Sequence, residues 1–170
     1  MYCYQNRNCC SNPCSCLIGP QGPVGPEGPT SHVYGTIYND GTQSIVVNTA
    51  GTYVTVGLNT TGPANDTTVS TNEITITEDG TYAIYYRLYV SGASQIYTAT
   101  VFNSGTAIAP ATTTVAATQV SGESFVATLS AETIVTLSEG DVLSLGLTSN
   151  TTGTIAVGAL ANATLSVKKL

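Results

Sequence analysis

The residues best suited to chemistry in this sequence are five cysteines near the N-terminus, which can form disulfides or bind a metal. No cysteine occurs in residues 17–170, and the chain has a single histidine. Because the spacing also lacks the Cys-x-x-Cys pattern of zinc sites, we expect disulfides and no metal. An odd number of thiols leaves at least one to pair between chains, and adjacent cysteines bond each other only with strain. The candidates for inter-chain disulfides are Cys3, Cys9, Cys10, Cys14 and Cys16.

The cysteines and the charge of the chain indicate its surroundings and partners. Disulfides persist in oxidising compartments, so we expect the protein to work outside a cell. The net charge is −6 with only four lysines and arginines, which leaves no basic surface for nucleic acid or for an anionic membrane. No apolar run approaches the length of a membrane span, so we expect no membrane partner.

Catalytic groups are scarce in the rest of the chain. His32 has no second histidine or cysteine near it in sequence, and we expect it to be an exposed linker residue. Residues 31–170 therefore lack a nucleophile–base pair, and we expect no enzyme and no cofactor. The acidic residues follow turn patterns that explain their positions without catalysis, although turn carboxylates leave calcium binding open. These residues are Asp40, Glu78, Asp79, Glu139 and Asp141.

Residues 19–30 form four uninterrupted Gly-X-Y triplets with proline at every X position. Glycine at every third position is required where three polyproline-II chains pack around one axis, so the stretch predicts a collagen-like stalk and a trimer. A stiff Pro/Gly linker in a single chain is the alternative. The stalk would span roughly 37 Å at 3.1 Å per residue, too short to hold three chains together alone. The triple-helix glycines are Gly19, Gly22, Gly25 and Gly28.

Residues 31–170 are predicted to form one all-β domain, a two-sheet sandwich or jelly roll, because short β-branched runs alternate with turn residues. We expect a loop over residues 60–66 and a hairpin that turns at Glu78-Asp79-Gly80. The expected strands are 33–38, 44–48, 51–58, 73–77, 81–90, 95–103, 107–117, 124–130, 133–137, 142–148, 154–160 and 163–167.

The strand over residues 81–90 is apolar or aromatic on both faces. One face, with Tyr82, Ile84, Tyr86, Leu88 and Val90, suits the core of the sandwich. The other suits a subunit interface, where tyrosine and arginine are enriched, and we expect its arginine to pair with a carboxylate there. A solvated face with a few tyrosines is the alternative. The trimer-interface candidates are Tyr85, Arg87 and Tyr89.

The overall plan resembles the BclA-like, collagen-like glycoproteins of bacterial exosporium filaments. A Cys-rich segment over residues 1–18 precedes the stalk, and Asp79-Gly80-Thr81-Tyr82 opens a long aromatic strand. Glu139-Gly140-Asp141-Val142 opens another strand, and Ala163-Thr164-Leu165-Ser166-Val167 fits a closing strand. The resemblance implies a C1q/TNF-like jelly roll, homotrimeric and displayed on a spore surface. The stalk is far shorter than is typical of that family, which favours a subunit of an endospore appendage.

We expect a structural protein: a trimer that assembles head to tail into an extracellular fibre through its N-terminal tail. Because residues 31–170 contain no cysteine, the contact between a tail and the next head must be non-covalent. Its partners would be further copies of the chain and, through a disulfide, a Cys-containing spore-surface anchor protein. The alternatives are an anchored C1q-like binding or adhesion module displayed as a discrete trimer, and a phage-type fibre tip. The tail-docking candidates are Tyr2, Tyr4, Leu17 and Ile18.

Overall fold

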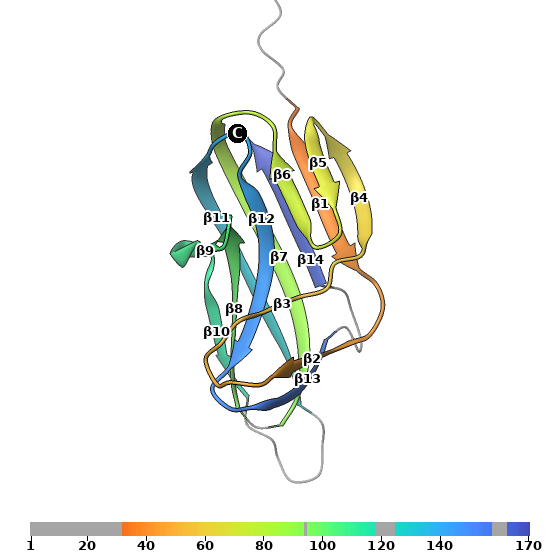
Figure 1. The fold of residues 1–170 in the computed structure, drawn as a ribbon, viewed down its shortest axis with the longest axis vertical. Coiled ribbons are helices and arrows are strands. Elements are labelled where there is room, and N and C mark those ends of the chain that lie inside the picture. The colour runs from red at the N-terminus through yellow and green to blue at the C-terminus, as the bar shows by residue number, and fades with distance from the viewer. Residues whose placement is uncertain (1–31, 94, 118–124, 158–162) are drawn as a thin grey trace, which may run out of the picture. The chain divides into compact units, whose positions relative to one another are not determined.

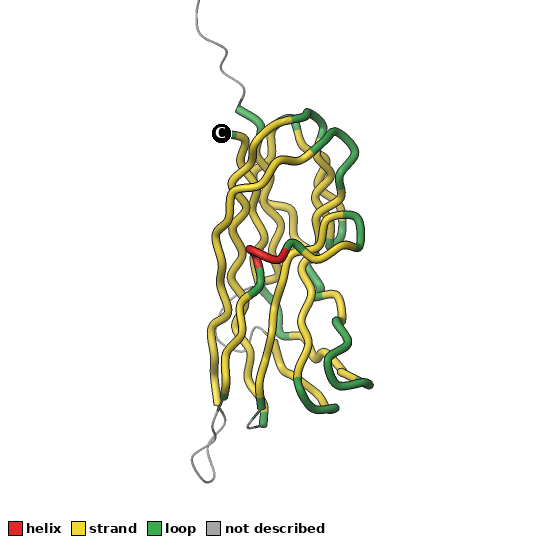
Figure 2. Tube along the Cα trace, turned by 90° about the vertical axis from the view of Figure 1, so that its left-hand side faces the viewer, coloured by secondary structure: helices red, strands yellow, loops and turns green. Residues whose placement is uncertain are grey.

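The computed structural model describes residues 32–93, 95–117, 125–157 and 163–170, which form two antiparallel β-sheets packed face to face (Figure 1). Helix in these residues is limited to one 3₁₀ turn, η1 (Ala109–Ala111), as Figure 2 shows. The expectation of an all-β sandwich is confirmed for this part of the chain. Within the same residues, no helix has the length and apolar character needed to cross a membrane.

The first sheet is built around the long strand β7 (Gly80–Gly92). Along one edge it pairs over its whole length with β11 (Phe125–Leu137), from Gly80 opposite Leu137 to Gly92 opposite Phe125. Along the other edge it pairs with two shorter strands in turn. The remaining strands of this sheet, in spatial order towards β4, are β2 (Gln43–Val47), β13 (Gly153–Val157), β14 (Ala163–Lys169), β1 (Tyr34–Asn39) and β4 (Thr60–Asn65).

The second sheet lies across the core and has β8 (Ile96–Asn103) and β12 (Val142–Ser149) at its centre. These two strands pair from Leu143 opposite Asn103 to Ser149 opposite Tyr97. Shorter strands extend the sheet on both sides: β10 (Thr113–Ala116), β6 (Glu73–Ile76), β5 (Thr67–Ser70), β3 (Val54–Thr55) and β9 (Thr106–Ala107).

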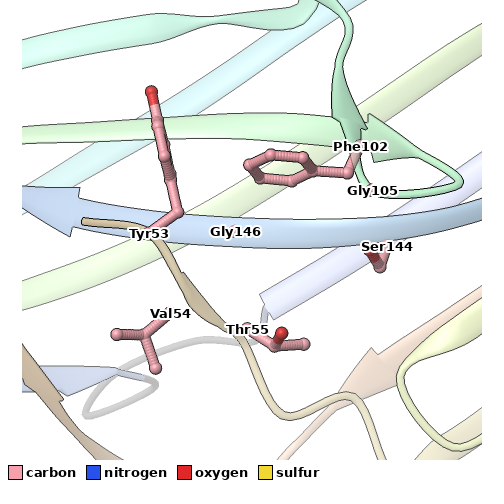
Figure 3. A pocket seen from close by; sticks show the side chains of 7 residues that line it. All are labelled: Tyr53, Val54, Thr55, Phe102, Gly105, Ser144 and Gly146. Carbon is pink, nitrogen blue, oxygen red and sulfur yellow. The ribbon is translucent and has the colours of Figure 1, made fainter. Parts of the chain in front are cut away.

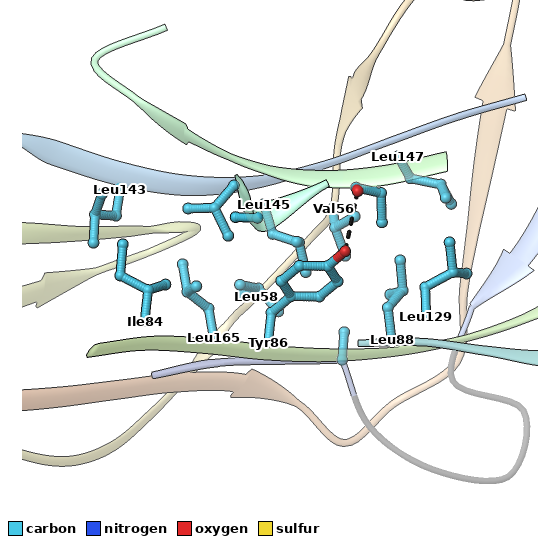
Figure 4. Packing of buried hydrophobic residues seen from close by; sticks show 14 of the residues in the cluster. Val56, Leu58, Ile84, Tyr86, Leu88, Leu129, Leu143, Leu145, Leu147 and Leu165 are labelled. Atoms are coloured by element: carbon cyan, nitrogen blue, oxygen red, sulfur yellow. Dashed lines mark hydrogen bonds between the residues drawn. The ribbon is translucent and has the colours of Figure 1, made fainter. Parts of the chain in front are cut away.

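The core consists of the inward side chains of both sheets, which alternate with outward ones along each strand. In Figure 4, Leu143, Leu145 and Leu147 of β12 face Ile84 and Tyr86 of β7 across the gap. The set predicted for the inner face of residues 81–90 is confirmed, since all five side chains are at most 1% exposed. The hydroxyl of Tyr86 donates a hydrogen bond of 3.0 Å to the carbonyl of Ala99, so the sheets are joined by one polar contact inside the core.

The predicted hairpin at Glu78-Asp79-Gly80 is wrong. The strand before it, β6, pairs with β5 and β12 in the second sheet, whereas β7 after it belongs to the first. The turn is therefore a crossover between the two sheets. Its backbone is held by Tyr82, whose hydroxyl donates to the carbonyl of Glu78 at 2.8 Å.

Several other predicted elements also differ from the structure. Of residues 60–66, predicted as a loop, Thr60–Asn65 form the edge strand β4, and the two strands predicted over 124–130 and 133–137 are the single strand β11. The long predicted strands over 51–58 and 107–117 contain only the short pairings β3, β9 and β10, with η1 between the last two.

The buried tyrosines give the domain a defined response to alkaline pH. Burial raises the pKa of Tyr86, and likewise that of Tyr82, above the ordinary value of 10.0. Because the folded-state pKa is the higher one, the stabilisation is fully present below about pH 10 and is lost as the pH rises through the folded-state pKa. We expect the free energy of unfolding to fall as the pH rises above 10, and to fall less in Tyr86→Phe.

Urea unfolding at each pH would measure this effect. The Tyr86→Phe variant should also be less stable at pH 7, by about 1–3 kcal/mol, because the carbonyl of Ala99 loses its buried donor. Equal pH slopes for the two proteins would contradict a role for Tyr86 in the alkaline transition.

Candidate subunit interface

The outward face of β7 carries the three residues that the sequence pattern assigned to an interface. Tyr85, Arg87 and Tyr89 alternate with the buried core residues, and β-strand geometry places them on the opposite side of the sheet. The register of β7 with β14 and β11 determines which residues lie beside them. Tyr85 lies between Ser166 of β14 and Glu132 of β11, and Arg87 between Thr164 and Ser130 on the same strands.

Arg87 forms a different contact from the one expected. Its guanidinium carbon lies 5.3 Å from the centre of the Tyr89 ring, a cation–π arrangement. Its Nε atom is buried and has no hydrogen-bond partner among the described residues. In the described part of this chain, the expected ion pair of Arg87 with a carboxylate is not formed. Glu132 stands opposite Tyr85 and therefore only diagonal to Arg87.

Exposed apolar side chains gather on this same face. Tyr34 of β1, which is 38% exposed, begins a row that runs through Lys168 and Ala83 to Ile134 of β11, which is 63% exposed. Tyr85 is 39% exposed in the next row. Val126 and Val46 extend the apolar surface towards the other end of the sheet. We call this surface the tyrosine face; it comprises Tyr34, Tyr38, Val46, Tyr85, Arg87, Tyr89, Val126 and Ile134.

Sequence reasoning identified only the centre of the tyrosine face. Tyr34 and Tyr38 alternate with buried residues of β1, and this period-2 pattern could have marked them as outward residues. The pattern did not predict that Tyr34 and Tyr38 lie on the same sheet surface as β7. The strand between β1 and β7 is β14, which comes from the C-terminal end of the domain.

Two of the five turn carboxylates, Asp79 and Asp141, bond backbone amides in the way that turn residues do. Asp141 accepts a hydrogen bond of 2.9 Å from the amide of Ser138, and Asp79 accepts one of 2.8 Å from the amide of Glu139. Among the described residues, no group of three or more His, Cys, Asp or Glu side chains could hold a metal ion. The nearby Glu78 pairs with Lys169 at 2.8 Å, and this hydrogen bond raises the pKa of the lysine.

The remaining predicted site residues lie outside the described residues. They are the disulfide candidates Cys3, Cys9, Cys10, Cys14 and Cys16, the stalk glycines Gly19, Gly22, Gly25 and Gly28, and the tail-docking candidates Tyr2, Tyr4, Leu17 and Ile18. His32, the first described residue, is exposed, as expected of a linker residue.

No protein-family model matches the chain, and no curated protein matches it by sequence. Among solved structures, it is similar to the crystal structure of murine APRIL at pH 5.0, with a TM-score of 0.50 and 12% sequence identity. The similarity covers 82% of this chain and 99% of that chain. APRIL is a TNF-family jelly-roll protein. The described domain is a TNF-like jelly roll.

The tyrosine face is the outer surface of the first sheet, mainly of β1, β14, β7 and β11, and the core lies on the other side of that sheet. It combines aromatic rings, aliphatic side chains and Arg87 with the exposed charges of Lys168 and Glu132, and of these residue types tyrosine and arginine are enriched at protein interfaces.

Proposed function

We propose that this protein is a structural subunit of an extracellular, spore-surface fibre of the endospore-appendage type. In this proposal, three chains form a homotrimer through their jelly-roll heads, and residues 19–30, which precede the head in sequence, form a short collagen-like triple helix. Trimers then join head to tail through the Cys-rich residues 1–18. The chain has no catalytic role.

The tyrosine face is the observation that carries the proposal. A monomer would expose Tyr34, Tyr85 and Ile134 on one face of the sheet, and exposed aromatic side chains of this kind are enriched at protein interfaces. TNF-like neighbours are trimers, and uninterrupted Gly-X-Y triplets are typical of helices of three chains.

The distribution of cysteines supports polymer formation through the tail. All five precede residue 17, so disulfides can join tails to one another or to a second protein but cannot join a tail to a head. Covalent bridges would then lock each bundle of three tails, while the docking of a tail on the next head stays non-covalent. Tyr2, Tyr4, Leu17 and Ile18 supply the apolar groups for that docking.

A discrete trimer with a binding or adhesion role is the second candidate function. The same cysteines could fix it to a Cys-containing anchor protein on the spore surface. This alternative predicts no polymer under any condition, so it is separable by microscopy.

The test is negative-stain electron microscopy of the purified full-length protein and of a variant lacking residues 1–18. We expect filaments with a regular axial repeat from the full-length protein and only discrete trimers from the truncated one. A variant with serine at all five cysteine positions is the matched control, because it keeps the length and apolar groups of the tail. Filaments that persist without residues 1–18 would contradict tail docking, and discrete trimers from both proteins would favour the anchored module.

A further inference from the structure

A pocket of about 240 Å³ opens on the outer face of the second sheet, on the opposite side of the core from the tyrosine face. β3, β8 and β12 contribute to it, together with the turn after β8. Figure 3 shows the ring of Phe102 directed towards Tyr53 across the strand at Gly146. The lining residues are Tyr53, Val54, Thr55, Phe102, Gly105, Ser144 and Gly146.

Glycine makes the pocket possible at its floor. A β-carbon at Gly146 would lie 2.5 Å from Cε2 of Phe102, so any side chain there would displace the ring. A second glycine, Gly105, forms the turn at the rim with a φ of 84°, in the left-handed region that favours glycine. The short strand β3 completes the wall by pairing Thr55 with Gly146.

Two aromatic rings form a corner in this pocket. The ring centres of Tyr53 and Phe102 lie 5.2 Å apart, and the ring planes meet at 79°. The edge of one ring faces the other, which fixes both orientations. A ligand entering the corner therefore meets aromatic surface on two sides.

The polar groups of the pocket are neutral. Hydroxyls come from Ser144, Thr55 and Tyr53, and none of the seven lining residues is charged. This lining favours a neutral ligand over a phosphate, a carboxylate or a metal ion, which are bound best by opposing charges or several anionic oxygens.

We propose that this pocket binds one neutral pyranose sugar unit. A pyranose ring has an apolar face of C–H groups, whose positive edges suit the negative face of an aromatic ring. Its periphery carries hydroxyls that can exchange hydrogen bonds with Ser144 and Thr55. The volume is below the range of drug-sized pockets, which matches one ring and not an extended chain. The sugar is either free or the end unit of a glycan.

This inference is independent of the fibre proposal. The pocket and the tyrosine face belong to different sheets, so a trimer built through the tyrosine face leaves the pocket open. The protein can therefore assemble without binding a sugar, and it can bind a sugar without assembling into fibres.

Saturation-transfer NMR on the full-length protein would test the proposal. The probes are the methyl glycosides of glucose, mannose and galactose, which vary the hydroxyl orientation at C2 and C4, and of N-acetylglucosamine, which has an acetamido group at C2. Each is compared with its free sugar and one disaccharide. We expect saturation transfer to at least one pyranose at millimolar concentration. A preference for the glycosides or the disaccharide over the free sugar would indicate a glycan-borne unit, and equal binding a free sugar.

Variants assign the signal to the pocket. Phe102→Ala and Tyr53→Ala should each weaken binding at least tenfold, while Ile96→Ala, an exposed apolar residue elsewhere on β8, should leave it unchanged. Tyr53 lies in a partly exposed position, so its variant keeps the test valid if Phe102→Ala does not fold. The proposal is overturned if no probe binds, or if folded variants at both aromatic positions bind as well as the unchanged protein.

Discussion

Replacing Tyr85 with alanine is expected to make the trimer dissociate at far higher protein concentration than the unchanged protein. Tyr85 lies at the centre of the tyrosine face and is 39% exposed in a single chain, so truncation removes aromatic area that only a neighbouring subunit could cover. An interface hot spot of this kind contributes about 2 kcal/mol or more. A closed ring of three subunits has three equivalent interfaces, so the loss per trimer is about 6 kcal/mol.

Mass photometry across nanomolar concentrations would measure this change in proteins that lack residues 1–18, because the proposed tail disulfides and filaments would otherwise hold the subunits together. Arg87→Ala and Tyr89→Ala should act in the same direction, because the guanidinium and the ring contact each other and lose their shared geometry together. Ile96→Ala is the matched control: it removes a residue that is 41% exposed, but from the outer face of the other sheet. If all three variants on β7 keep the trimer mass of the unchanged protein, the tyrosine face is not the interface.

Replacing Leu145 with alanine should lower the free energy of unfolding by about 2–5 kcal/mol. Leu145 is fully buried at the centre of β12, where it packs among the side chains that β7 presents from the other sheet. Alanine leaves a cavity that neither sheet can close, because the ladders on both sides fix the strand positions.

Urea unfolding of the full chain at one fixed protein concentration would measure this loss. The midpoint should shift to lower urea with an unchanged slope, which indicates that the same surface is exposed on unfolding. Ile96→Ala serves again as control and should change stability by no more than about 0.5 kcal/mol. A Leu145→Ala variant as stable as the control would show that the two sheets are not packed as described.

The pattern of the sequence predicted the strands that alternate most strongly. In β7 every second residue from Tyr82 to Val90 is apolar and buried, so the period of two identified both the strand and its inner face. The same strand supplied the interface prediction, because its outer face breaks the usual polar alternation. The local pattern was sufficient to predict both faces of β7, because side chains two residues apart lie on the same face of a strand.

Prediction failed where non-local pairing decides the structure. Residues 60–66 contain Gly62 and Pro63, which indicate a loop, yet Thr60–Asn65 form β4 at the edge of the first sheet. Gly62 and Pro63 lie where the pairing of β4 with β1 shifts register, and proline is tolerated at such an irregularity in an edge strand. The turn at Glu78-Asp79-Gly80 has hairpin composition, and only the destination of β6 in the other sheet makes it a crossover.

The tyrosine face and the pocket also differ in how far the sequence predicts them. The centre of the tyrosine face lies within one strand, so the pattern of that strand was enough to predict it. The pocket brings together Tyr53, Phe102 and Gly146, which are distant in sequence and meet only through the pairings of β12 with β3 and β8. No short motif contains these residues, so sequence reasoning could not find them.

The pairing of β1 with β14 determines when the head can fold during synthesis. Tyr34 pairs with Lys168 of β14 on one side and with Asn65 of β4 on the other, so β1 can pair early with β4 but joins β7 in the sheet only once β14 has left the ribosome. Contacts between such distant residues make folding slow, and the other edge of β1 stays open meanwhile. In the proposed trimer, three heads would meet before three stalks share a register, so winding of the triplets would proceed from Gly28 back towards Gly19. The collagen-like segment would then be synthesised before the head but wound after it.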